Sequence, residues 1–408
     1  MKHSSATFSR NRQFRAASES HSDRRGILIA WSIWIVLAAG LIAAGLFNVL
    51  WMSGIRAEAR RCAESSAISA GHSYLSDDLL RSFQQPFEHD GRAARCKEAA
   101  IGMANQYRRH KALPKLRTQD VQLAWSPASD AMNNAATLVP AKITVHCDGH
   151  DEGFRIPLFF SGLTSLENSR LGVCASVSME HAPSAFRPGP QTSVPMLPFA
   201  ILNDAVAGSA QASTQGSGQW TKCIESGSGR DTFGWNNDLH EFEPGPDGLP
   251  EITVTLYSNG STGADAFVPL RFCTQPAGQS SAGIFDWIES GLTHQDLQTL
   301  GVTEVTFPGT LPSYSMSSQQ ITSVAVALQA KVGEPCVVSL CSAPDSESGY
   351  RVKLTRPVAA RIIRVAASPG GNLKVTLQPC VLVTSTAVTS LQPALADNRY
   401  IYSVRLCD

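Results

Sequence analysis

The stretch Ile27–Ile55 reads ILIAWSIWIVLAAGLIAAGLFNVLWMSGI and contains no Asp, Glu, Lys, Arg or His. An α-helix rises about 1.5 Å per residue, so this stretch is longer than the roughly 20 residues that cross a bilayer. A basic segment precedes it, and most of the chain follows it. The sequence therefore predicts a membrane anchor, with the transmembrane helix over residues 27–52 and the lipid bilayer as its first partner.

Three tryptophans lie near the two ends of the stretch: Trp31 and Trp34 near its start, and Trp51 near its end. Trp31 and Trp51 would be about 30 Å apart along a helix, which matches the hydrocarbon core of a bilayer. Indole rings are enriched at the level of the lipid headgroups. We expect these three side chains to be the interface anchors of the helix.

Two other interpretations fit the stretch less well. A secretory signal peptide has an apolar region of about 7–15 residues and a small-residue cleavage site soon after it. The apolar stretch here is about twice that length, and Arg56 follows it. A buried helix of a soluble protein is rarely apolar on all sides over such a length. A permanent anchor is the favoured interpretation.

Small residues four positions apart lie inside the predicted span. They pair Ala39 with Ala43 and Gly40 with Ala44, and Asn48 is the one strongly polar side chain. Small residues and a polar group at this spacing are typical of a helix that packs against a partner helix. The alternative is a helix exposed to lipid, with Asn48 near the interface, and the sequence favours this alternative.

The orientation of the anchor follows from its flanking charges. More basic residues precede the span than follow it, so the positive-inside rule places the N-terminus in the cytoplasm and exports the C-terminal body. All ten cysteines lie after the span, which is typical of a disulfide-bonded body in an oxidising compartment. The candidate disulfide cysteines are Cys62, Cys96, Cys147, Cys174, Cys223, Cys273, Cys336, Cys341, Cys380 and Cys407.

The composition excludes several function classes. The net charge is zero and charged residues make up 17% of the chain, so no basic patch indicates nucleic acid. Residues 1–26, rich in Ser and Arg, are expected to be a disordered cytoplasmic tail. The part after the span is long enough for two domains of ordinary size.

Helical patterns follow the span directly. The Ala-rich run from Arg56 continues without proline to about Gly71, a short helix is expected at Asp77–Leu80, and another over Gly91–His110. We therefore predict a helical stalk over residues 53–117. Cys62 and Cys96 would lie on two successive helices, where they either form a disulfide or remain buried thiols.

Period-two patterns then predict a β-rich body. Residues 118–183 form a first β-rich domain, in which Ile143 and Val145 alternate with polar residues. Five prolines from Pro183 to Pro198 mark a linker at 184–200, and a second α+β domain covers 201–408. Its clearest helix is Ser317–Lys331, whose expected buried stripe is Ile321, Val324, Val326, Leu328 and Val332. The predicted fold class is α+β: one transmembrane helix, a helical stalk and a β-rich exported body.

Catalytic signatures are missing from the sequence. It has no nucleophile elbow, zinc helix, phosphate loop, dinucleotide-binding glycine pattern or Cys-x-x-Cys pair. Two clusters of possible metal ligands, 146–152 and 238–247, are better explained as a hairpin turn and a solvated loop, because their spacing fits no known site. We therefore expect no enzyme activity, no cofactor, no metal and no small-molecule substrate.

The order of these features resembles one known family. Arg24-Arg25-Gly26, one span, the Ala-rich helix through about Gly71 and a β-rich body together resemble a TadG-like protein of the Tad/Flp pilus-assembly systems. Weaker similarity continues through Val194–Ile201, Val254–Gly260, Ile284–Ile288 and 317–379. The resemblance implies a non-enzymatic structural component of pilus assembly or envelope adhesion, held in the bacterial inner membrane with its body in the periplasm beside other pilus-assembly or envelope proteins.

Two departures from the family pattern limit what is carried over. Related minor pseudopilins have a Glu five residues after the processing glycine, whereas Trp31 occupies that position here. Some TadG proteins have a von Willebrand A-type domain with an Asp-x-Ser-x-Ser metal motif, and this spacing does not occur here. The alternative function is a membrane-anchored exported binding or adhesion module that is independent of pili.

Overall fold

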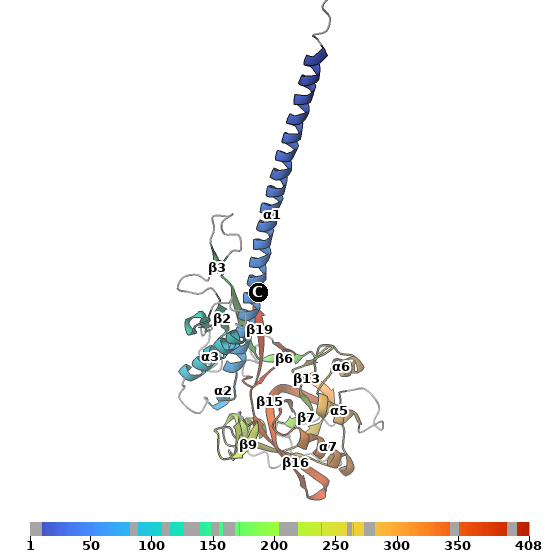
Figure 1. Cartoon of the computed structure of the whole chain (residues 1–408). Coiled ribbons are helices and arrows are strands. Elements are labelled where there is room, and N and C mark those ends of the chain that lie inside the picture. The colour runs from blue at the N-terminus through green and yellow to red at the C-terminus, as the bar shows by residue number, and fades with distance from the viewer. Residues whose placement is uncertain are drawn as a thin grey trace, which may run out of the picture. The chain divides into compact units, whose positions relative to one another are not determined.

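The computed structural model shows a mixed α+β protein with one long apolar N-terminal helix and a β-rich body (Figure 1). It describes residues 10–81, 89–107, 115–125, 139–147, 155–157, 168–170, 172–203, 219–237, 239–258, 263, 265–272, 282–342, 351–389 and 398–407. This confirms the α+β class, the apolar helix and the β-rich body that the sequence predicts.

Helix α1 (Arg10–Tyr74) contains the whole apolar stretch and continues well beyond it. From Ile27 to Ala43 every side chain is exposed. From Ala44 onward a stripe along the helix is buried: Ala44, Asn48, Ile55, Ala59, Cys62, Ala63, Ser66, Ala67, Ala70 and Tyr74. In the described part of the chain, this is the one helix long and apolar enough to cross a membrane.

The chain divides into two compact units. Unit 1 comprises Met1–Ala63, Asn105–Leu116 and His146–Cys174, and unit 2 comprises Glu64–Ala104, Arg117–Val145 and Ala175–Asp408. Helix α1 contributes residues to both units. Unit 1 also contains an antiparallel pair of short strands, β3 (Arg155–Pro157) and β4 (Asn168–Arg170).

The helices expected after α1 are present. Helix α2 (Asp78–Arg81) is the short helix at the Asp-Asp-Leu-Leu run, and α3 (His89–Tyr107) is the Ala-rich one. Where α1 ends, Gly71 packs closely on the body: a Cβ added there would lie 3.1 Å from Val404 and 3.6 Å from Val177. Ala residues and one Gly on this face of α1 permit that close approach.

A seven-stranded sheet forms the centre of unit 2. Its strands in order are β10 (Ile252–Leu256), β16 (Asn372–Pro379), β15 (Arg351–Ser368), β14 (Pro335–Cys341), β7 (Met196–Leu202) and β11 (Phe267–Pro269), and β13 (Gly309–Pro312) also pairs with β15. Strand β7 is buried at every residue and parallel to β14. Its unbroken apolar sequence is typical of a strand that is covered on both faces.

Two helices cover part of this sheet. Helix α5 (Ala282–Ser290) packs on β7, and α7 (Ser318–Ala330) packs on β15 and β16. Ser317 caps α7 in a capping box with Gln320, as its Ser-x-x-Gln sequence favours. A further helix, α6 (His294–Leu300), follows α5.

The remaining strands form smaller sheets. A five-stranded sheet has the order β1 (Val121–Ala124), β2 (Lys142–His146), β5 (Cys174–His181), β19 (Ile401–Cys407) and β17 (Leu382–Val383). A three-stranded sheet contains β12 (Val305–Thr306), β6 (Pro183–Phe186) and β18 (Ala387–Thr389), and a two-stranded ribbon contains β8 (Phe233–Asn236) and β9 (Glu241–Pro244). Short helical turns lie at η1 (Thr118–Asp120), η2 (Thr221–Glu225) and η3 (Pro369–Gly371). The predicted alternation in β2 is confirmed, because Ile143 and Val145 are its buried residues.

The segment 184–200, expected as a Pro-rich linker, differs from that expectation. It contains most of β6 and the first part of β7, both largely buried, and it lies within unit 2. Pro198, inside β7, has no N–H to donate to a neighbouring strand. The sheet accommodates it because the register between β7 and β14 shifts at this point, between Val337 and Ser339. The division of the body into two domains stays a prediction.

Two positions of the stripe predicted for α7 differ from the prediction. Val332 lies after the end of the helix and is only partly buried. Ile321, Val324 and Leu328 are buried, as expected for helical spacing, but Val326 is 71% exposed. Val326 lies two residues after Val324, about 200° around the helix, and therefore on the opposite face.

Candidate functional site

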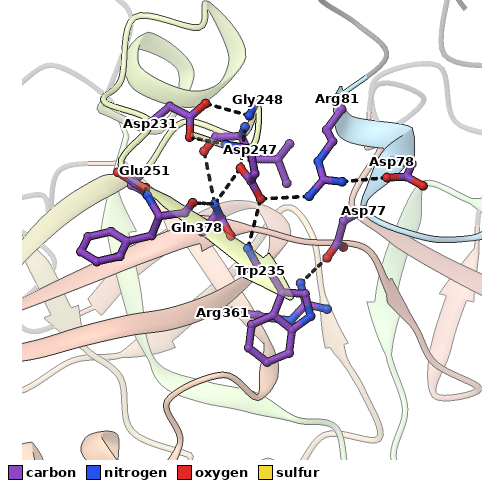
Figure 2. Close-up of polar contacts among 12 residues, drawn as sticks. Asp77, Asp78, Arg81, Asp231, Trp235, Asp247, Gly248, Glu251, Arg361 and Gln378 are labelled. Carbon is purple, nitrogen blue, oxygen red and sulfur yellow. Dashed lines mark hydrogen bonds and ion pairs between the residues drawn. The ribbon is translucent and has the colours of Figure 1, made fainter. Parts of the chain in front are cut away.

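A buried polar network in unit 2 begins directly after α1. Asp77 is only 4% exposed. Its carboxylate accepts a hydrogen bond from the backbone N–H of Val381 at 2.7 Å and forms an ion pair with the guanidinium of Arg361 (Figure 2). A buried charge is tolerated only when it is paired, and this pair joins the end of α1 to β15 and to the residues after β16.

Arg361 on β15 is held on two sides. Its guanidinium carbon lies 4.6 Å from the centre of the Trp235 ring, so a cation–π contact adds to the ion pair with Asp77. Its Nε is buried and makes no hydrogen bond, which costs free energy. The ion pair with Asp77 and the cation–π contact with Trp235 must offset that cost. Arg361 therefore links the α1–α2 turn with the β8–β9 ribbon.

Asp247, between β9 and β10, is the second centre of the network. It accepts hydrogen bonds from Arg81 Nη2 at 2.9 Å, the N–H of Trp235 at 3.2 Å, Gln378 Nε2 at 3.2 Å and the N–H of Leu249 at 3.0 Å. These donors come from α2, β8, β16 and its own loop (Figure 2). A carboxylate that accepts several bonds of this kind is held in one orientation.

Asp78 extends the network toward α3. It accepts from Arg81 at 2.8 Å and from Arg95 at 2.5 Å. Burial alone would raise the pKa of Asp78, but the hydrogen bonds and charges of Arg95 and Arg81 outweigh it and lower this pKa below its ordinary value of 3.8. Burial also opposes the charge of Arg81, but Asp247 and Asp78 outweigh it and raise the pKa of Arg81.

Acidic side chains also fix the loop that holds the ribbon. Glu251, 7% exposed, accepts from the N–H groups of Thr232 at 2.8 Å and Phe233 at 2.6 Å. Asp231 accepts from the N–H groups of Asp247 at 3.0 Å and Gly248 at 2.7 Å. These bonds satisfy backbone donors that no strand pairs.

The contacts of this network stabilise the fold. Its carboxylates accept hydrogen bonds and ion pairs from arginines and backbone N–H groups. Within the described residues, no group of three metal-ligating side chains is present. The network can hold the α1–α2 turn, the ribbon and the central sheet in one arrangement.

The structure places the residues predicted for the span as follows. Trp31 and Trp34 are exposed by 67% and 71%, and Trp51 by 37%. Of the small residues, Ala39, Gly40 and Ala43 are exposed, and Ala44 is buried. Asn48 is 5% exposed, and neither its amide nitrogen nor its amide oxygen makes a hydrogen bond. The expectation of a lipid-exposed Asn48 is therefore wrong, since protein covers this side chain.

The predicted disulfides are not seen among the described cysteines, and Cys273 lies outside the described residues. Cys336 and Cys341 are five residues apart on the extended strand β14, about 16 Å, far beyond the roughly 7 Å limit between bonded Cα atoms. Cys336 and Cys380 are kept apart by β15, which lies between β14 and the end of β16 and separates them by about 9.5 Å.

The buried thiols are also chemically quiet. Burial raises the pKa of Cys96 and of Cys336 to about 12 and raises that of Cys380 well above its ordinary value. The thiolate is the reactive form, so these groups act as small apolar side chains. Cys62, Cys147 and Cys341 are buried, Cys174 is exposed, and Cys223 and Cys407 are partly buried.

The network residues were mostly missed by sequence reasoning. Asp77 is read as the start of a helix, and Asp247 as part of a solvated acidic loop together with His240, Glu241 and Glu243. Those three residues are exposed, but Glu241 and Glu243 belong to strand β9 and not to a loop, and Asp247 is largely buried. Asp238 and residues 148–152 of the other acidic cluster lie outside the described residues. An unpaired acidic residue beside a helix end is the one signal that could have indicated Asp77.

Comparisons with protein-family models, with curated proteins and with solved structures found no match for this chain. Its function is therefore argued from the sequence and the geometry above.

Proposed function

We propose that this chain is a membrane-anchored, non-enzymatic structural component of a Tad/Flp pilus-assembly or cell-envelope adhesion machinery. The observation that carries the proposal is α1 itself. Its side chains from Ile27 to Ala43 are all exposed and mostly apolar, while its last turns are buried in the body. A helix with that exposure needs lipid around one part and protein around the other.

The way in which α1 is connected to the body supports a structural role. Ala67, Ala70 and Tyr74 at the end of α1 are fully buried, and Asp77 ties the next turn to Arg361 and Val381. A pull on the anchor is thereby passed to the central sheet through packing and through a buried ion pair.

The proposed location is the bacterial inner membrane, with the N-terminus in the cytoplasm and the body in the periplasm. This orientation rests on the excess of basic residues before the span, because the described cysteines form no disulfide that would add support. Partners are the bilayer and other pilus-assembly or envelope proteins, and no nucleic acid is expected from a chain of zero net charge.

Protease protection tests the topology. In cells whose outer barrier has been opened, protease should cut the body and leave a tag on the N-terminal tail intact. Cutting of the tail from outside would overturn the orientation. A crosslinker at exposed Trp34 should then capture pilus-assembly proteins, and a matched crosslinker at buried Ala67 should not. Equal capture from both positions would contradict the role of the span.

The alternative function is an exported binding or adhesion module that is independent of pili. An aromatic groove on the body, described below, favours it. Genomic neighbourhood separates the two: pilus ATPase and pilin genes beside this gene support assembly, and their absence supports the binding module.

A further inference from the structure

A groove of about 440 Å³ lies between the β8–β9 ribbon and β15. Trp235 and Phe242 line one side, and Ile363, Arg364 and Gly333 line the other. The groove is separate from the buried network, although Trp235 contributes to both. Its size is that of a binding site for a short ligand.

The ribbon wall of the groove is mainly aromatic and held in place, and His240 and Glu241 also line it. Trp235 pairs with Phe242 and Phe233 with Pro244, so these four side chains share one face of the ribbon, and Glu241 and Glu243 share the other. Trp235 cannot turn away, because its ring stacks on Arg361 and contacts Gly333, where an added Cβ would lie 3.1 Å from the ring. A pre-organised aromatic wall lowers the entropy cost of binding.

The opposite wall is an open strand edge. Strand β14 pairs with β15 as far as Arg361, and the N–H of Gly333 still donates to the carbonyl of Ile362 at 3.0 Å. From Ile363 to Ser368, β15 pairs with β16 on its other edge, and no described strand covers the edge toward β14. Unpaired backbone groups on such an edge are a template for another strand.

The charge of this region selects the ligand. Residues 351–379, which include β15 and β16, contain six basic residues and no Asp or Glu. Arg356 is paired with Glu225 and Arg361 with Asp77, whereas Arg364 is exposed and makes no ion pair with any described residue. Glu241 also lines the groove, on its ribbon wall, so the cation on the strand wall, Arg364, is the group that complements a carboxylate of the ligand.

We infer that this groove binds an extended peptide segment of a partner protein, with alternating apolar and acidic side chains. The segment adds as a strand to the edge Ile363–Ser368. Its apolar side chains contact Trp235 and Phe242, and an acidic one pairs with Arg364. This inference does not depend on pilus assembly, since it needs only the body of the protein.

The test uses the full chain in lipid nanodiscs and a fluorescent, end-capped peptide of alternating valine and glutamate. Saturable binding is expected by fluorescence anisotropy, with affinity about tenfold lower for the peptide with lysine in place of glutamate. A peptide N-methylated on alternate residues should lose binding, because it cannot complete the strand pairing.

Protein variants locate the site. Arg364→Glu should reverse the preference between the acidic and basic peptides, and Phe242→Ser should weaken binding about tenfold. The matched control is Lys353→Glu, the same charge change on β15 where Thr310 and Ser342 occupy both edges; it should leave binding unchanged. No saturable binding, equal binding of both peptides, or uptake of a chitin oligosaccharide instead of the peptide would overturn the inference.

Discussion

The two parts of α1 follow opposite rules about which side chains are exposed. From Ile27 to Ala43 the large apolar side chains are exposed, for example Ile35 by 62% and Leu37 by 55%. Near its end the fully buried residues are mostly small, as at Ser66, Ala67 and Ala70. One regular helix therefore has two kinds of surface: exposed large apolar side chains, which suit lipid, and buried small residues, which let the backbone approach the body closely.

The largest effect is expected where the body part of α1 is tied down. Asp77→Ala leaves Arg361 buried without its charge partner, and it should destabilise the body by about 3–5 kcal/mol. Urea unfolding of the protein in nanodiscs measures this loss, while the membrane-bound fraction stays unchanged. The control is Asp78→Ala, because Asp78 is more exposed; it should cost less than about 1 kcal/mol. Similar costs for both would contradict the central role of Asp77.

A charge in the exposed part should have the converse effect. Leu37→Arg places a guanidinium near the middle of the span, which costs about 2.5–3.5 kcal/mol on insertion scales. We expect a smaller membrane-bound fraction after carbonate extraction, with the body unfolding at the same urea concentration. Val326→Arg is the matched control, since Val326 is also an exposed apolar residue but lies on α7. If both variants remained fully membrane-bound, the assignment of the span would be wrong.

Adding bulk compares the two parts with one substitution. Ala67→Leu forces a larger side chain into a fully packed position and should destabilise the body by about 1–3 kcal/mol. Ala39→Leu, in the exposed part, should leave the stability of the body unchanged. The urea midpoints of the two variants measure these changes in stability. A loss of stability from Ala39→Leu would show that protein covers Ala39.

Sequence reasoning predicted the features that have a local period. The apolar stretch and the β2 alternation each depend on neighbours in the sequence, and the structure confirms both. The cysteines misled it, because an even number on one side of a span says nothing about whether an intervening strand such as β15 separates two of them.

The network could not be predicted in the same way. Asp77 and Arg361 are 284 positions apart, and their pairing depends on how the sheet brings β15 to the end of α1. Each residue looks ordinary alone: an acidic residue before a helix, and an arginine inside a strand. Only burial distinguishes a paired charge in a core from a solvated one, and burial is a tertiary property.

The smallest expected effect concerns pH and contrasts Asp78 of α2 with the exposed part of α1. Arg95 and Arg81 hold the pKa of Asp78 below its ordinary value of 3.8, so ionised Asp78 stabilises the folded body. This contribution is complete above about pH 4 and is lost as the pH falls through the lower pKa of the folded state. Asp78→Asn should therefore remove less than about 1 kcal/mol at pH 7 and flatten the loss of stability between about pH 4 and pH 2.

Urea midpoints across this pH range measure the change in stability. The exposed part of α1 has no ionisable group from Ile27 to Ala43, so the membrane-bound fraction of the protein should stay the same at every pH. An unchanged acid profile in the variant would mean that Asp78 contributes nothing through its charge.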